Sequence, residues 1–228
     1  MQVESITISA GDDRVSALYE HPTHDRGQQV ILLAHGAGLP MDSPFMTTIA
    51  AGLAAAGYPV LRFNYAYAER MQREGTRRPP DRRPRLEQVH LAALGALRDR
   101  APGRPVILAG KSMGGRMSSL LAAEGEPCSG LAFFGYPLHP ARKTDRLRSE
   151  HFPDIRQPSL FMQGTRDVLC QLDLLERELG NLGGHVTLRR IEDADHDFKV
   201  PKRAGRSRDE LLAELVQNAV SWAESNAD

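Results

Sequence analysis

The sequence predicts an α/β protein with a mainly parallel central sheet and helices on both faces. Short apolar runs rich in β-branched residues alternate with longer segments of helical composition along the 228 residues, which is the pattern of a covered parallel sheet. Runs such as 29–34 and 130–136 lack polar alternation, as strands buried on both faces do. Near the start, 2–9 and 14–21 flank a Gly-Asp-Asp turn and are expected to pair as a hairpin. We expect about seven to eight strands in a single domain spanning residues 1–228.

The other elements follow in order along the chain. Strands are predicted at 60–65, 106–109, 159–162 and 185–191, and helices at 44–56, 86–98, 113–124, 172–179 and 208–223. Ser43 can cap the first of these helices, because Pro44 suits a first turn. The segment 66–85 is rich in Arg and Pro and is expected to be an irregular connection. About twenty residues separate Tyr136 from Pro158, which is too few for a large cap domain.

The motif Gly-Lys-Ser-Met-Gly at 110–114 joins a predicted strand directly to a predicted helix. So abrupt a turn strains the turning residue, and the flanking glycines allow close approach of strand and helix. Ser112 is therefore expected to be exposed at a helix N-terminus, which favours developing negative charge. A phosphate-binding loop is the first alternative, but that motif needs a glycine where this chain has Pro105. A glycine-rich turn with an idle serine is the second alternative.

Two further residues follow strands in the order that such a serine requires. Asp167 follows the strand predicted at 159–162, and His196 follows the strand that ends at Ile191. Polar groups at the carboxyl ends of parallel strands meet at one edge of the sheet, and the order Ser, Asp, His is that of the α/β-hydrolase triad. The alternative for His196 is a solvated acidic turn. Asp173 is the second choice for the acid.

The sequence His-Gly-Ala-Gly at 35–38 follows the strand that precedes the first helix. This is the place from which α/β-hydrolases supply an amide to the oxyanion hole. We expect the amide of Met113, with that of Gly36 or Ala37, to hold the oxyanion. His35 is expected to shape this loop by hydrogen bonding rather than to act as a base.

Three other residues are expected to have structural rather than catalytic roles. Lys111 is expected to be a solvated residue of the strand-to-helix turn. Cys170 lies near the predicted site but is expected simply to be buried. Trp222 belongs to an apolar stripe of the last helix and is expected to pack in the core.

Six motifs give the chain a specific resemblance. They are HGAG at 35–38, RFNY at 62–65, GKSMGG at 110–115, FFGYPLHP at 133–140, QGTRD at 163–167 and DHDF at 195–198. The chain resembles a compact α/β-hydrolase, similar in proportions to the dienelactone-hydrolase-like group and most similar to a family of small bacterial hydrolases that carry these motifs. The resemblance extends over roughly residues 30–225 and implies the α/β-hydrolase fold. Dienelactone hydrolases proper place cysteine at the turn, whereas this chain has Ser112.

These features predict a serine hydrolase that cleaves an ester or a thioester through an acyl-enzyme. Ser112 would attack the acyl carbon, His196 would carry the proton, and Asp167 would orient the imidazole. No metal or organic cofactor is expected. The alternative from another class is a binding protein with this fold whose triad is vestigial or unused. A peptidase of the same fold is less favoured, because no propeller or cap segment is present.

Composition places further bounds on the function. The formal net charge is zero, so no bulk polyelectrolyte role is indicated. Cys128 and Cys170 provide neither a disulfide framework nor metal-ligand spacing. The first residues lack a basic head with an apolar run, and no apolar stretch approaches the roughly 20 residues that span a bilayer. We therefore expect a cytoplasmic protein without a membrane partner; the sequence does not determine its oligomeric state.

Basic residues are concentrated in three segments that follow strands. The segment 66–85 has seven arginines against three acidic residues, 139–151 has four basic against two acidic residues, and 199–208 has five basic residues and no acidic one. Loops of one sign around a cleft attract an oppositely charged substrate, so these segments predict an anionic substrate or partner, such as an acyl-CoA. Nucleic acid is less favoured, because aromatic residues are not interleaved with the arginines. The alternative is that these side chains are merely solvated.

Overall fold

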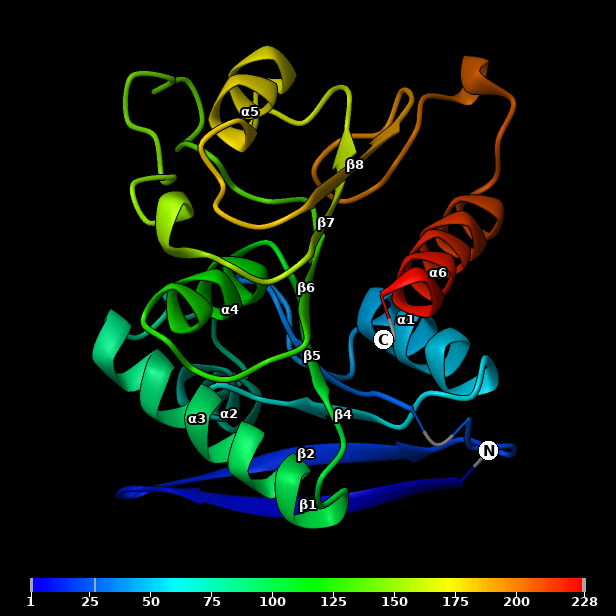
Figure 1. The fold of residues 1–228 in the computed structure, drawn as a ribbon. Helices are drawn as coiled ribbons and strands as arrows, with labels where there is room; N and C mark the ends of the chain where they lie inside the picture. Colours follow the sequence, from blue (N-terminus) through cyan, green and yellow to red (C-terminus); the bar gives the residue numbers. More distant parts are fainter. Residues whose placement is uncertain (1, 27, 227–228) are drawn as a thin grey trace.

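A single eight-stranded sheet forms the centre of the molecule (Figure 1). The computed structural model describes residues 2–26 and 28–226; Met1, residue 27 and residues 227–228, which the predicted single domain includes, lie outside it. The strand order is β1-β2-β4-β3-β5-β6-β7-β8. Among the strand pairs of the described residues, β1–β2 and β2–β4 are antiparallel and the others are parallel. The predicted mainly parallel sheet is therefore confirmed.

The strands have the following bounds: β1 Gln2–Ala10, β2 Asp13–His21, β3 Val30–Ala34, β4 Val60–Phe63, β5 Val106–Lys111, β6 Gly130–Phe134, β7 Ser159–Gly164 and β8 Val186–Ile191. Strands β3 to β7 are buried at every position. Their mainly apolar composition follows from this burial, because helices cover both faces of a parallel sheet. β5 and β7 each continue two residues beyond the predicted ends.

The helices lie in two layers. Their bounds are α1 Pro44–Ala55, α2 Ala66–Glu74, α3 Arg83–Arg100, α4 Met113–Ala123, α5 Leu172–Leu179 and α6 Arg208–Ser225, with short 3-10 turns η1 Phe152–Asp154 and η2 Lys202–Ala204. α1 and α6 cover one face of the sheet, and α2, α3 and α4 cover the other (Figure 1). Each face has its own apolar core. Trp222 is only 5% exposed and belongs to the α1–α6 side, as predicted.

The expected irregular connection at 66–85 is wrong for its first half. Ala66, Tyr67 and Ala68 are buried against the sheet and begin α2. This apolar first turn anchors an otherwise polar helix, so tertiary packing outweighs the polar composition of the segment. Gly75 ends α2 in the left-handed conformation, with a φ of 63°. The proline-rich stretch after it is irregular, and α3 begins at Arg83.

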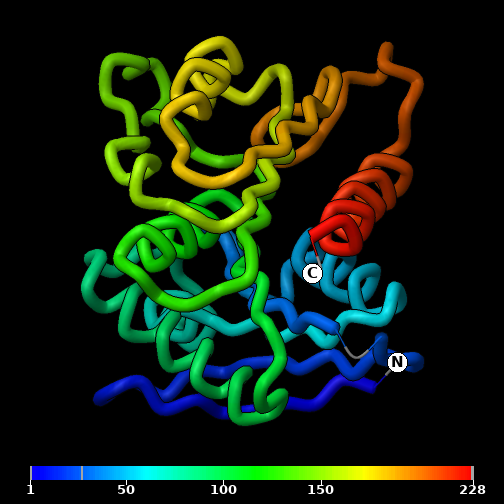
Figure 2. The backbone as a smooth tube through the Cα atoms, in the orientation of Figure 1, coloured from blue at the N-terminus to red at the C-terminus, as the bar shows by residue number. Residues whose placement is uncertain are grey.

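Two connections determine how open the sheet edge is. Between β6 and β7 the only helical element in the described chain is the three-residue turn η1, so the predicted absence of a large cap is confirmed. Residues 192–207 leave β8 and cross to α6 (Figure 2). None of the described helices is both long and apolar enough to span a membrane.

Candidate active site

Ser112 occupies the strained turn between β5 and α4. Its φ of 50° and ψ of −114° lie outside the ordinary regions for a residue with a side chain. The neighbouring glycines make the turn possible: an added Cβ at Gly110 would lie 2.3 Å from the amide nitrogen of Gly115, and one at Gly114 would lie 2.4 Å from the carbonyl oxygen of Ala34. The local geometry is that of a nucleophile presented at the end of a strand.

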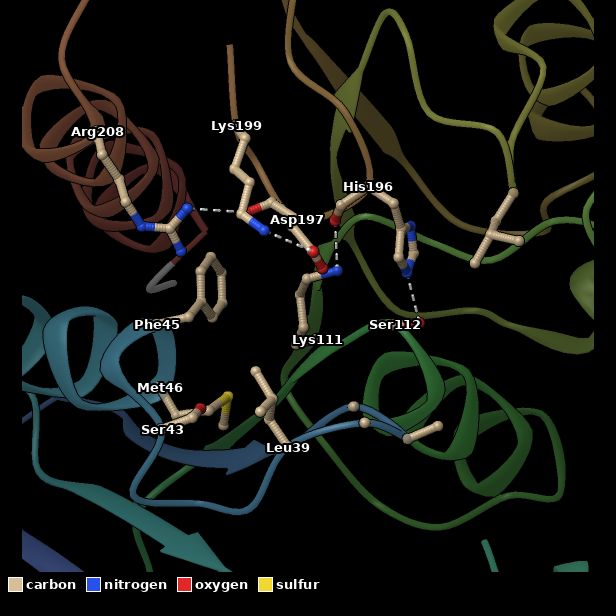
Figure 3. A pocket seen from close by; sticks show the side chains of 14 residues that line it. Leu39, Ser43, Phe45, Met46, Lys111, Ser112, His196, Asp197, Lys199 and Arg208 are labelled. Atoms are coloured by element: carbon tan, nitrogen blue, oxygen red, sulfur yellow. Dashed lines mark hydrogen bonds and ion pairs between the residues drawn. The ribbon is translucent and has the colours of Figure 1, made fainter. Parts of the chain in front are cut away.

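A chain of hydrogen bonds joins the three predicted catalytic side chains. His196 Nε2 lies 2.8 Å from Ser112 Oγ, and His196 Nδ1 lies 2.7 Å from Asp167 Oδ2. A carboxylate can only accept, so Nδ1 carries the proton and Nε2 accepts from the serine hydroxyl. The structure thus brings together Ser112, Asp167 and His196 from the ends of β5, β7 and β8 (Figure 3, which labels the serine and the histidine). Their catalytic roles remain predictions.

Gln163 is a contributor that sequence reasoning missed. Its Nε2 donates to Asp167 Oδ2 at 2.6 Å, while its Oε1 accepts from the Tyr136 amide at 2.8 Å. The Leu169 amide donates to the other carboxylate oxygen of Asp167 at 2.8 Å. The Asp167 side chain is completely buried, and these donors fix its orientation. The available signal was a polar residue that follows the apolar run Leu160–Met162 of β7.

The loop that carries His196 is fixed by its own acidic residues. Asp195 Oδ1 accepts hydrogen bonds from the backbone amides of Asp197 and Lys199, at 2.9 and 2.8 Å. Phe198 is buried and stacks on Phe45, with a centroid distance of 5.8 Å. The acidic neighbours of His196 therefore shape its turn, and the histidine itself points to Ser112.

The loop after β3 lies against the serine, as predicted. A Cβ at Gly36 would lie 3.5 Å from the Cβ of Ser112. The Gly36 carbonyl accepts from His35 Nδ1 at 2.7 Å and from the Tyr67 hydroxyl at 3.1 Å. Because the Ala37 N–H belongs to the same rigid peptide unit, these two bonds hold its direction. Tyr67 was missed, because it belongs to the segment predicted to be irregular.

His35 has both ring nitrogens occupied by backbone groups. Its Nε2 accepts from the Tyr65 amide at 3.1 Å, so Nδ1 carries the proton that it donates to Gly36. Burial lowers the pKa of His35 to about 4, which keeps it neutral near pH 7. The structure thus places His35 in a loop-shaping role.

On the other side of the serine, the Met113 amide is the first of α4, and a first helical amide has no acceptor within its helix.

The expectation that Lys111 is solvated is wrong. The residue is 9% exposed, and its Nζ donates to the carbonyl of His196 at 2.6 Å. It lies near the rings of Phe45 and Phe198, 6.0 and 5.6 Å from their centroids. Burial lowers the pKa of the ammonium to about 8. The last residue of β5 points into the molecule here because the His196 loop closes over it.

A cavity of about 340 Å³ opens beside Ser112 and His196 (Figure 3). Its apolar wall comes from Leu39, Phe45 and Met46, and its cationic side chains are Lys111, Lys199 and Arg208. Of the three basic segments, only 199–208 contributes lining residues from the described chain. Arginines of 66–85 instead form ion pairs with acidic side chains, among them Arg70–Asp81, Arg78–Glu74 and Arg85–Asp13.

Other predicted candidates lie apart from this arrangement. Asp173 is exposed in the first turn of α5, and the carboxylate on His196 is that of Asp167. Cys170 is buried, as expected, and burial raises the pKa of its thiol. Within residues 2–26 and 28–226, no three His, Cys, Asp or Glu side chains are grouped to hold a metal ion.

Similar proteins agree with this fold. A family model described as an alpha/beta hydrolase domain matches residues 27–224. A dienelactone hydrolase from Anabaena variabilis is similar at 22% identity and a TM-score of 0.78, over 100% of this chain and 99% of that one. An α/β serine hydrolase without a lid from Xanthomonas campestris is similar at 21% identity and a TM-score of 0.72, over 97% and 95%. These structures support the fold alone. With the family model matched along most of its length, this chain belongs to the α/β-hydrolase domain family.

Proposed function

We propose that this protein is a serine hydrolase that cleaves carboxylic esters or thioesters through an acyl-enzyme. The observation that carries the proposal is the hydrogen-bonded chain from Asp167 through His196 to Ser112, a strained serine that lines a cavity. A retained chain of this kind favours catalysis over a purely binding role, because binding requires neither the strained turn nor the buried carboxylate.

The reaction follows from the positions of the hydrogen-bonded atoms. Ser112 Oγ attacks the acyl carbon and passes its proton to His196 Nε2, forming a tetrahedral intermediate. The imidazolium then gives this proton to the leaving alcohol or thiol, and the acyl group stays on the serine. A water molecule then attacks the acyl-enzyme, with His196 again taking and returning the proton, and the carboxylic acid is released. Asp167 stabilises the imidazolium by accepting from Nδ1.

The oxyanion of the intermediate needs donors that are already oriented. We assign this role to the Met113 amide and to the amide of Ala37 or Gly36. The first is the opening amide of α4, and the second lies in the loop that His35 and Tyr67 hold. One such donor is typically worth about 3 kcal/mol of barrier.

The substrate is a small acyl compound. The volume of about 340 Å³ fits a small molecule, and the apolar wall fits its hydrocarbon part. The cationic residues of the cavity favour a substrate with negative charge. Serine hydrolases among the similar structures are consistent with ester cleavage.

A covalent probe tests the proposal directly. We expect a fluorophosphonate to label the protein once, at Ser112, and we expect Ser112→Ala to abolish labelling. Ser221→Ala removes an exposed hydroxyl of α6 and is the matched control, which keeps full labelling. A panel of esters and thioesters of varied acyl length then measures turnover. Folded protein that resists the probe and hydrolyses no member of the panel would refute the proposal and favour a binding role.

A further inference from the structure

Lys111 has donors that the folded protein does not use. An ammonium group has three N–H donors, and within the described chain one hydrogen bond is found, to the His196 carbonyl. The side chain lines the cavity and is nine-tenths buried. The rings of Phe45 and Phe198 also lie near it, and they accept no conventional hydrogen bond. The remaining N–H groups are available to a molecule in the cavity.

The negative charges of Asp167, Asp197 and Asp195 favour this ammonium from a distance, but within the described chain none of these carboxylates is hydrogen-bonded to it. Asp197 is the one carboxylate among the lining residues, and it pairs with Lys199 at 3.2 Å near the cavity mouth, where both side chains are more than 60% exposed. Asp167 is committed to His196, and Asp195 accepts amides of its own loop. Arg208 lies on the same side as Lys199 (Figure 3). The residues that line the cavity therefore include three cationic side chains and one carboxylate.

We propose that Lys111 is the anion-binding group of the active-site cavity and that it receives a carboxylate of the ester substrate. This inference rests on the hydrolase function proposed above and specifies its substrate class. The apolar wall formed by Leu39, Phe45 and Met46 would contact the hydrocarbon between the carboxylate and the ester. Arg208, at the mouth, would attract the same charge during entry.

The chemistry of the cavity favours a carboxylate over a neutral polar group. A buried ammonium is costly unless a partner compensates its charge, and a carbonyl oxygen alone compensates it only in part. A carboxylate would accept the unused donors and neutralise the charge in one contact. Charge-assisted bonds of this kind are stronger than neutral ones. A structural role alone would need only the bond to the His196 carbonyl.

The test compares matched esters that differ in one charge. Methyl hydrogen succinate is paired with methyl succinamate, which places the charge on the acyl side; 4-acetoxybenzoate is paired with 4-acetoxybenzamide, which places it on the alcohol side. We expect the carboxylate to be preferred in at least one pair. Lys111→Met should lower that preference, measured as the ratio of kcat/KM values, by about 10–100-fold. Lys143→Met is the matched control, because Lys143 is exposed in a loop that does not line the cavity.

The outcomes separate this inference from the function on which it rests. Hydrolysis of the neutral esters with no preference for either carboxylate would overturn the inference and leave the hydrolase function standing. A preference that survives Lys111→Met would also overturn it and would move the anion site to Arg208. Absence of hydrolysis of all four esters together with absence of probe labelling would refute the hydrolase function itself. A preference lost in Lys111→Met and kept in Lys143→Met supports the assignment.

Discussion

Asp167 is held in place by more than the histidine that it orients. Its completely buried carboxylate accepts from Gln163, from the Leu169 amide and from His196. The carboxylate must keep both its charge and its direction to stabilise an imidazolium. In the proposed mechanism, Gln163 is therefore a positioning residue, since it is itself held by the Tyr136 amide.

Substitutions at Asp167 and Gln163 are expected to lower kcat to different extents. We expect Asp167→Asn to lower kcat by about 10³–10⁴-fold, because the amide favours the wrong tautomer of His196. Gln163→Met removes one charge-assisted bond, and we expect it to lower kcat about tenfold with KM unchanged. Steady-state kinetics on a neutral ester measures both. Asp173→Asn is the control: if it lost activity while Asp167→Asn kept it, the assignment of the acid would be wrong.

The role proposed for Lys111 comes at a cost to the stability of the native state. Burial lowers its pKa from the ordinary 10.5 to about 8, against the opposing charges of Asp167, Asp197 and Asp195. The native state therefore binds this proton less well than the unfolded chain does. The resulting penalty is complete below pH 8 and disappears as the pH rises toward 10.5. Proteins commonly keep a residue that lowers the free energy of unfolding where that residue is needed for function.

Removing this charge is expected to stabilise the protein. At pH 7, Lys111→Met should raise the free energy of unfolding by about 1–2 kcal/mol, since the relief of the buried charge exceeds the lost bond to His196. The gain should shrink between pH 8 and pH 10, where native Lys111 loses its proton. Urea denaturation across this range measures it. A loss of stability at pH 7 would show that the ammonium serves chiefly to brace the His196 loop.

At the scale of elements, the predictions succeeded where local chemistry dominates. The glycines beside Ser112 predict a close contact of β5 with α4, and the backbone distances at Gly110 and Gly114 require it. Apolar runs located the central strands because burial on both faces favours apolar residues. α2 was missed because three buried residues, Ala66 to Ala68, outweigh a polar remainder. Such an anchor is recognisable only once the sheet beneath it is known.

The sequence did not predict the roles of side chains that depend on contacts with another segment. Lys111 is a plausible solvated residue in its own segment, but the loop around Phe198 covers it. Tyr67 likewise acts through Gly36, which is distant in the sequence. Gln163 acts on the nearby Asp167 but is itself held by the distant Tyr136 amide. Chain order along a parallel sheet predicted Ser112, Asp167 and His196, because their strands end at one edge. It could not predict which neighbours would support them.

At the scale of the whole molecule, charge is distributed differently from the sequence expectation. The formal net charge of zero conceals a cationic cavity. Most of the basic character of 66–85 is offset locally, since Arg70, Arg78, Arg83 and Arg85 pair with carboxylates. Ion pairs near the surface contribute little to stability, but they reduce the contribution of these arginines to any long-range field. Attraction of an anion to the site therefore depends on the few cations that line it.

This distribution predicts a limited and local salt dependence. Attraction by charges at the cavity mouth is screened within about 8 Å at physiological ionic strength, whereas a buried ammonium is screened much less. Raising the salt concentration should therefore lower kcat/KM for a carboxylate ester by a few-fold through its capture step, and should leave the matched carboxamide unchanged. Arg208→Gln should flatten this dependence, and Arg77→Gln, at an exposed arginine outside the cavity, should not. An equal salt response of carboxylate and carboxamide would show that the cationic residues at the mouth do not steer the substrate.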